Sequence, residues 1–207
     1  SAYLLPIGIP HFKKVFGLSE CQAIEALHAH IRLCYDVCHF AVGYEDHQAV
    51  IDELKRQGIK VGKIQIRSAL KAAMPDEFKS REAVKASLAV FNESTYLHQV
   101  VALKNDGTFK RYPDLPEALQ EVHDSTVKEW RSHFHVPLFV SGYGVLESTQ
   151  PDIQEVLSIQ QDQPFTAHLE VETYTWEVLP EQLKLPIADS IVRELQWVKE
   201  EMFAKHA

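Results

Sequence analysis

The sequence predicts an α/β protein in which strands alternate with helices, and three observations support this prediction. Segments 33–37 and 61–68 have the uniformly apolar or alternating pattern of β-strands. Segments 19–32 and 49–57 place apolar residues at helical spacing. A series of this kind indicates βα units and a largely parallel sheet. The chain has no internal repeat and no evident linker, so we expect a single domain over residues 1–207.

The first elements are defined by their end signals. Residues 1–18 contain prolines and glycines and show no clear periodicity. Ser19 is a good N-cap for the helix 19–32. Gly58 is expected to end the helix 49–57, since glycine is the commonest residue just beyond a helix C-terminus.

The second half is predicted to add helices and strands in turn. In order, these are a helix Ser80–Phe91 capped by Ser80, a strand Tyr96–Leu103, a returning strand Thr108–Tyr112, a helix Pro116–Glu129, an extended segment Ser132–Val140, a loop Ser141–Gly144, a helix Pro151–Ile159, a strand His168–Trp176 and a helix Ile187–Phe203. The turn 105–107 (Asn-Asp-Gly) favours a β-hairpin. Pro137 argues against a central, fully paired strand at 132–140.

The strand His168–Trp176 has an unusual polar face. Side chains alternate along a strand, so His168, Glu170, Glu172 and Tyr174 share one side. Burying two neighbouring carboxylates is costly unless a cation or a proton lies between them. The pattern therefore predicts a polar site at this strand.

Two earlier stretches offer matching groups at strand ends, where ligands gather in parallel α/β proteins. Asp36 and His39 lie at one strand exit, and His133 and His135 are two residues apart in an extended segment. Together with Glu172 they suit a divalent metal such as Zn, Mn or Mg. The alternative to a metal site is that the histidines are ordinary surface or core residues and that the two glutamates face solvent. Short patterns of this kind often have no metal.

Further side chains are candidates for substrate binding. Arg67 and Arg131 have the planar group that binds phosphate or carboxylate bidentately. Gln65, His98 and Tyr174 complete the set that we expect near the site, although a buried His98 would equally well be bonded to backbone.

The composition limits the classes of function. The net charge of −8 argues against general nucleic-acid binding, which requires clustered Lys and Arg. Cys21, Cys34 and Cys38 form no disulfide framework, and we expect Cys34 and Cys38 to be reduced and buried rather than a metal pair. No apolar run approaches the roughly 20 residues that span a membrane, so no membrane insertion and a cytoplasmic location are expected.

These residues carry a resemblance to a known superfamily. The segment 35–39 (YDVCH) resembles the Asp-x-x-His strand end of the xylose isomerase-like TIM barrels, a superfamily that includes AP endonucleases. In that superfamily a later loop supplies a ligand pair, matched here by His133 and His135, and the last barrel strand ends in Glu-Thr, matched by 172–173. Gln65 occupies the position of the histidine on an intermediate strand.

A closer resemblance, covering most of the chain, is to the EboE-like metabolite traffic proteins. The similar stretches are LCYDVCHFAV, GKIQIRSAL, YLHQVV, HFHVPLF and HLEVETYTWEVLP. The resemblance implies the C-terminal part of a (β/α)8 TIM barrel with an inserted β-hairpin, from a chain about twice as long. Such a part exposes strand edges, so we expect it to pair with the missing N-terminal half or with a second copy.

Three functions remain open at this point. The first is a metal-dependent isomerase or epimerase acting on a sugar-like metabolite, with Glu170 and Glu172 as the catalytic carboxylates. The second is a non-catalytic metabolite-binding or traffic protein on the same scaffold. The third, an AP endonuclease-like phosphodiesterase, is disfavoured by the acidic balance of the chain.

Overall fold

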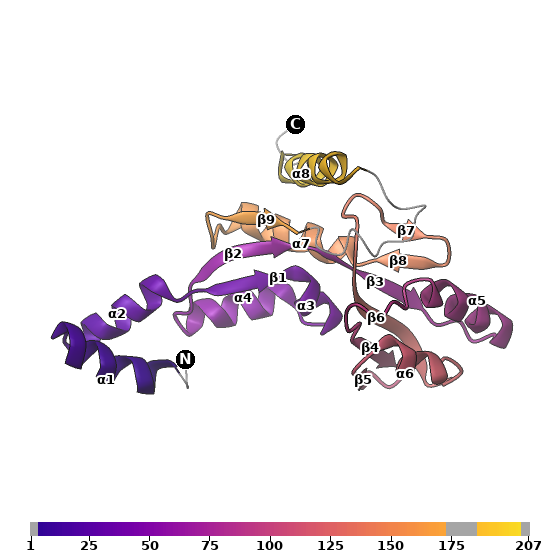
Figure 1. Ribbon diagram of the computed structural model, residues 1–207, viewed down its shortest axis with the longest axis horizontal. Helices are drawn as coiled ribbons and strands as arrows, with labels where there is room; N and C mark the ends of the chain where they lie inside the picture. Colours follow the sequence, from indigo (N-terminus) through magenta and orange to yellow (C-terminus); the bar gives the residue numbers. More distant parts are fainter. Residues whose placement is uncertain (1–3, 173–185, 204–207) are drawn as a thin grey trace.

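The computed structural model describes residues 4–172 and 186–203, which form a mixed α/β structure with two sheets (Figure 1). One sheet is parallel with strand order β1-β2-β9, and the other is antiparallel with order β5-β4-β6-β3-β8-β7. The expectation of a largely parallel sheet is therefore wrong for these residues. The strands described do not close into a barrel. None of the helices within these ranges combines the length and the apolar character needed to cross a bilayer.

The elements follow one another along the chain with these bounds. The helices are α1 Leu4–Phe16, α2 Glu20–His30, α3 Val37–Val42, α4 His47–Arg56, α5 Phe78–Ala89, α6 Leu115–Gln120, α7 Gln150–Asp162 and α8 Ile187–Phe203. The strands are β1 Leu33–Asp36, β2 Val61–Ile66, β3 Ser68–Ala73, β4 Val100–Lys104, β5 Phe109–Tyr112, β6 Val127–Val136, β7 Gly142–Tyr143, β8 Leu146–Ser148 and β9 Leu169–Val171.

The chain passes from one sheet to the other through a single residue, Arg67. Strand β2 ends at Ile66 in the parallel sheet, and β3 begins at Ser68 in the antiparallel sheet. Figure 1 shows the two strands as one long, gently curved ribbon. The sequence predicted one strand over 61–68 and missed the continuation to Ala73. Arg67 consequently lies at the seam between the two sheets.

Local signals account for most helix starts. Ser19 caps α2 as predicted, and its side chain and that of Gln22 form a reciprocal capping box. Asp46 caps α4 by accepting from the backbone of Ala49. The predicted cap Ser80 is wrong, because α5 begins at Phe78.

Turn chemistry overrides the helix predicted at 116–129. Helix α6 ends at Gln120. The Asp124 carboxylate then accepts from the backbone N of Thr126 at 2.9 Å and from its hydroxyl at 2.6 Å, a local turn that competes with helix. Strand β6 follows and is paired on both sides, by β3 and β4. It ends at Val136, so Pro137 lies just outside the strand and does not weaken it.

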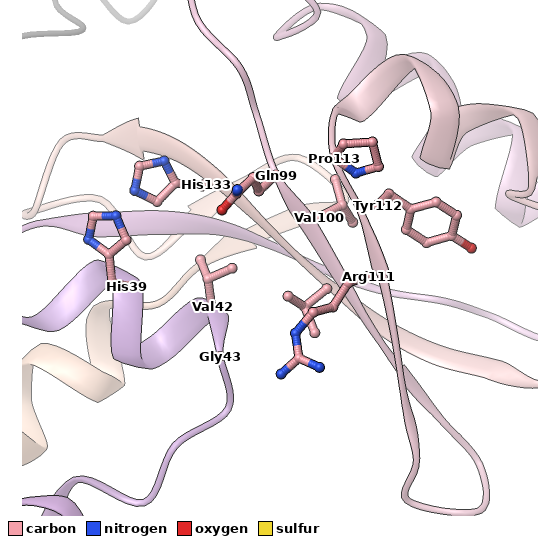
Figure 2. A pocket seen from close by; sticks show the side chains of 10 residues that line it. His39, Val42, Gly43, Gln99, Val100, Arg111, Tyr112, Pro113 and His133 are labelled. Carbon is pink, nitrogen blue, oxygen red and sulfur yellow. The ribbon is translucent and has the colours of Figure 1, made fainter. Parts of the chain in front are cut away.

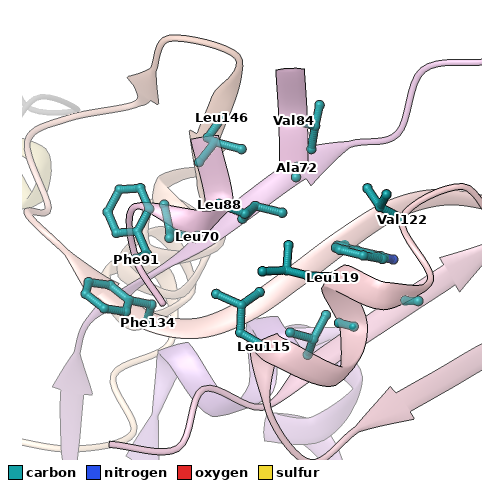
Figure 3. Close-up of a cluster of buried hydrophobic side chains, with 14 of the residues drawn as sticks. Leu70, Ala72, Val84, Leu88, Phe91, Leu115, Leu119, Val122, Phe134 and Leu146 are labelled. Carbon is teal, nitrogen blue, oxygen red and sulfur yellow. The ribbon is translucent and has the colours of Figure 1, made fainter. Parts of the chain in front are cut away.

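Apolar packing divides into two main clusters, one for each sheet. The antiparallel sheet packs Trp130 and Phe134 against α5 and α6, as Figure 3 shows for Phe134, Leu88 and Leu115. The parallel sheet packs Tyr35, Ile64 and Ile66 against α4, α7 and α8, and its other members include Ile51, Ile153, Val156 and Val198. The predicted hairpin is confirmed as β4 and β5, although it belongs to the larger sheet.

Helix α8 carries a buried carboxyl group that ties it to the end of β6. Glu194 is 4% exposed, and its Oε1 accepts from the backbone N of Leu138 at 3.3 Å. Burial raises the pKa of Glu194 from its ordinary value of 4.5 to about 7, against the smaller opposite effect of that hydrogen bond. Because the folded-state pKa is raised, the protonated carboxyl stabilises the fold below about pH 4.5, and this stabilisation is lost as the pH rises through about 7.

Replacing this carboxyl by its neutral isostere is expected to remove the pH dependence. Glu194→Gln should match the wild type near pH 4.5 and exceed it by about 1–3 kcal/mol near pH 8. Urea denaturation at both pH values measures the difference. Glu200→Gln, an exposed change on the same helix, is the control and should show no such trend. An equal difference for Glu194→Gln at both pH values would contradict the argument.

Candidate functional site

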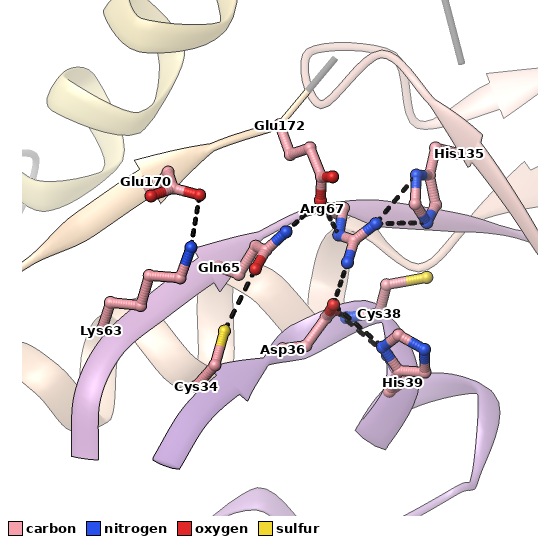
Figure 4. A network of polar contacts seen from close by, with 10 residues as sticks. All are labelled: Cys34, Asp36, Cys38, His39, Lys63, Gln65, Arg67, His135, Glu170 and Glu172. Carbon is pink, nitrogen blue, oxygen red and sulfur yellow. Dashed lines mark hydrogen bonds and ion pairs between the residues drawn. The ribbon is translucent and has the colours of Figure 1, made fainter. Parts of the chain in front are cut away.

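The seam residue Arg67 is the centre of a buried polar cluster (Figure 4). Its side chain is 8% exposed and forms ion pairs with Asp36, through Nη2, and with Glu172 Oε2, which lies 2.6 Å from Nε. Its Nη1 lies 3.3 and 3.2 Å from the two ring nitrogens of His135. The cluster therefore joins residues that are distant in the sequence and belong to both sheets.

Parallel pairing places the two carboxylates on either side of β2. Asp36 ends β1 opposite Gln65, and Gln65 is opposite Glu170 of β9, two residues before Glu172. Asp36 is also the N-cap of α3, because its Oδ1 accepts from the backbone N of Cys38 at 3.1 Å and of His39 at 3.4 Å. The strand-end argument from the sequence thus brings these groups to one place.

An irregularity in β6 presents the histidine pair. Ala69 of β3 is opposite His135, whereas the next residue, Leu70, is opposite Ser132. Strand β6 therefore carries two extra residues here, and such bulges re-aim side chains beside functional sites. His133 and His135 face the seam, while the intervening Phe134 is buried in the apolar cluster of the antiparallel sheet.

The pKa values of Asp36, His133 and His135 are all lowered in the cluster. Burial acts to raise the pKa of Asp36, but the hydrogen bond from His39 and the charge of Arg67 outweigh it and lower the pKa to about 2. Burial, followed by the charge of Arg67, lowers the pKa of His135 to about 2. Burial and the neighbouring His39 lower that of His133 to about 4. At neutral pH the carboxylate is charged and both imidazoles of β6 are neutral.

His39 lies at the exposed side of the cluster. Its Nδ1 is 2.9 Å from Asp36 Oδ2, and 57% of its side chain is exposed. The ring centroids of His39 and His133 are 4.4 Å apart, and those of His133 and His135 are 4.8 Å apart. The three imidazoles form a row that runs from the surface to the buried seam.

One set of donor atoms fits a metal ion. Ligand atoms of Cys38, His133 and His135 lie within 4.8 Å of one another. Around a single zinc ion such atoms lie within about 4 Å, so small side-chain shifts would complete the geometry. The Nε2 atom of His133 is buried and has no hydrogen-bond partner among the described residues. Burial and the charge of Asp36 raise the pKa of the Cys38 thiol, which a bound metal would have to deprotonate.

This donor set differs from the one that the sequence predicted. Asp36 and Glu172 were expected as ligands, but both face the guanidinium of Arg67, whose charge they already compensate. Cys38 was interpreted as an inert buried thiol. Its position two residues after the strand end, between Asp36 and His39, was the only signal in the sequence. Cys34, predicted to be buried, is exposed.

The remaining predicted site residues, Gln65 on β2 and Glu170 on β9, pair with different neighbours. Gln65 donates to Glu172 through Nε2 and accepts from the Cys34 thiol at 3.1 Å. Glu170 pairs with Lys63 and its side chain is 51% exposed, so it lies outside the cluster. Gln65 therefore borders the seam, whereas Glu170 lies toward solvent.

His98, Arg131 and Tyr174 are not brought into the cluster. His98 is buried between the carbonyl of His133 and the carboxylate of Glu93, the backbone-bonded alternative that the sequence left open. Arg131 donates to Asp152 at 2.9 Å, to Glu129 and to a backbone carbonyl. Its guanidinium is thus bonded to other residues of the fold instead of lying in the cluster. Tyr174 lies outside the described residues.

A cavity of about 470 Å³ adjoins the exposed end of the imidazole row. It lies between α3 and the hairpin β4–β5, and Figure 2 shows His39 and His133 along one side, with Gln99 next to them and Arg111 on the hairpin. A cavity of this size suits a small metabolite. His39 and His133 are therefore shared by the cluster and the cavity.

The fold and the site together define a mixed α/β protein with a buried guanidinium–carboxylate–imidazole cluster beside a cavity. Comparison with protein-family models, with curated proteins and with solved structures finds no match for this chain.

Removing the central cation should destabilise the fold. Arg67→Gln leaves the buried Asp36 and the partly exposed Glu172 without their counter-charge, and removing one partner of a buried ion pair costs about 3–5 kcal/mol. Arg67→Gln combined with Asp36→Asn should recover part of this loss, because one uncompensated carboxylate is removed. Urea denaturation at pH 7 measures both. Arg56→Gln, at an exposed ion pair on α4, is the control and should leave the stability close to that of the wild type. Equal effects of the two arginine substitutions would contradict this prediction.

Proposed function

We propose that the protein is a metal-dependent isomerase or epimerase that acts on a small sugar-like metabolite bound in the cavity beside His39. The observation that carries the proposal is the grouping of Cys38, His133 and His135 next to that cavity. The resemblance to xylose isomerase-like and EboE-like proteins agrees with this class of function. Its partner is thus a small molecule rather than a nucleic acid.

The donor set favours a transition metal. Two neutral imidazoles and a thiol suit zinc better than magnesium, which prefers oxygen ligands. Within the described residues, the Nε2 of His133 has no hydrogen-bond partner, so it offers a lone pair in the tautomer that carries its proton on Nδ1. A bound ion would supply polarisation of a substrate carbonyl or hydroxyl.

We assign proton transfer and positioning to the residues around the proposed metal site. His39 is the best-placed proton carrier, because Asp36 accepts from its Nδ1 and leaves Nε2 of the neutral ring as the acceptor. Asp36 orients His39, and Arg67 keeps Asp36 ionised. Glu172, predicted as a catalytic carboxylate, is held by Arg67 and by Gln65, so we assign it a positioning role.

Metal content tests the proposal directly. Protein dialysed against zinc and then against buffer should retain about one zinc per chain by elemental analysis. His135→Ala and Cys38→Ser should each lose most of it, since each removes one of three donors. Cys34→Ser, at an exposed thiol outside the donor set, should retain it. Circular dichroism of each variant confirms folding, and a folded wild type without retained metal overturns the assignment.

A second candidate function is non-catalytic metabolite binding, and a specific observation favours it. Arg67 already supplies the positive charge between Asp36 and Glu172, so the carboxylates need no metal. The two functions differ in their response to chelation. The enzyme should lose turnover of aldose and ketose sugars after EDTA treatment and regain it with zinc. A carrier should bind the same sugars equally well before and after EDTA, as measured by calorimetry, with no turnover in either state.

A further inference from the structure

The cavity beside the imidazole row carries a cation that the cluster does not use. Arg111 is exposed on β5, opposite Val101 of β4, and its guanidinium lines the cavity. Within the described part of the chain, no carboxylate and no carbonyl accepts from it. This sets Arg111 apart from Arg67, Arg81 and Arg131, whose guanidinium groups are all bonded within the fold.

The lining of the cavity is free of carboxylates. Besides Arg111, the polar side chains that line it are His39, His133 and Gln99, while the Tyr112 hydroxyl donates to Glu121. The carboxylates closest to the imidazole row are compensated, since Asp36 and Glu172 pair with Arg67. The cavity therefore has an uncompensated positive charge at the hairpin.

The hairpin holds Arg111 at this position. Side chains alternate along β5, so Phe109 and Arg111 share one face, and Tyr112 points into the apolar cluster of the antiparallel sheet. The Phe109 ring packs on Tyr44, with ring centroids 5.2 Å apart, and so fixes the hairpin against the loop after α3. Arg111 is thereby directed to the space between α3 and the hairpin (Figure 2).

We propose that Arg111 is an oxyanion-binding residue and that the ligand of the cavity is a small metabolite with a phosphate or carboxylate group. The planar guanidinium binds such groups bidentately. The anionic end of the ligand lies at Arg111, and its hydroxyl or carbonyl end reaches His39 and His133 on the other side. The inference rests on the proposed function in taking this cavity as the substrate site, but anion binding itself requires no metal.

Anion titration of the metal-free protein tests the proposal. Calorimetry with inorganic phosphate, and separately with acetate, should show saturable binding of at least one of the two, and the tighter one identifies the oxyanion class. Arg111→Gln should weaken that binding about tenfold, because a bidentate, charge-assisted contact is lost. Arg111→Lys keeps the positive charge but lacks the planar guanidinium, so its affinity for the anion should lie between those of the wild type and Arg111→Gln.

Two controls make the outcome specific. Arg56→Gln changes the net charge equally at an exposed site on α4 and should leave the affinity unchanged. His135→Ala should lose metal yet bind the anion as the wild type does, so failure of the metal assignment and failure of the anion site are distinguishable. The proposal is overturned if neither anion binds saturably, or if Arg111→Gln and Arg56→Gln weaken binding alike.

Discussion

The structure depends on one buried cation at the seam between the sheets. Arg67 compensates Asp36 and Glu172, two carboxylates that come from the ends of different strands. It also contacts His135 of the antiparallel sheet. A buried carboxylate without a partner costs several kcal/mol, so this arginine stabilises the junction between the two sheets.

The pairing of Arg67 with the two carboxylates determines which side chains of the cluster are left to bind a metal or a substrate. Because the carboxylates pair with the guanidinium, the donor atoms that remain in the cluster are neutral. They are the imidazoles of His133 and His135 and the thiol of Cys38. A neutral nitrogen and sulfur set selects against hard cations and favours zinc-like ions. In the proposed metal site, Arg67 thus leaves nitrogen and sulfur donors in place of the carboxylates that the sequence predicted.

Part of this arrangement is predictable from the sequence and part is not. The strand ends at Asp36 and Glu172 indicate convergence, because parallel strands end at one edge, whereas the histidine pair reaches the same place from the antiparallel sheet. The antiparallel sheet is not predictable in the same way, since the β3 sequence SALKAA has no β-branched residue and favours helix. Helix α1 is similarly concealed by the proline and glycine within it. The central role of Arg67 depends on both sheets, so local pattern alone does not reveal it.

The two sides of the cavity differ in charge because, within residues 4–172 and 186–203, Arg67 is paired with carboxylates and Arg111 is not. On the seam side, Arg67 is balanced by two carboxylates, and the neutral imidazoles lie between this pair and the cavity. On the hairpin side, no carboxylate among the residues that the structure describes forms an ion pair with Arg111. A ligand in the cavity therefore meets hydrogen-bonding rings at one end and a positive charge at the other. A neutral sugar would leave that charge unmatched, whereas an anionic one would satisfy both ends at once.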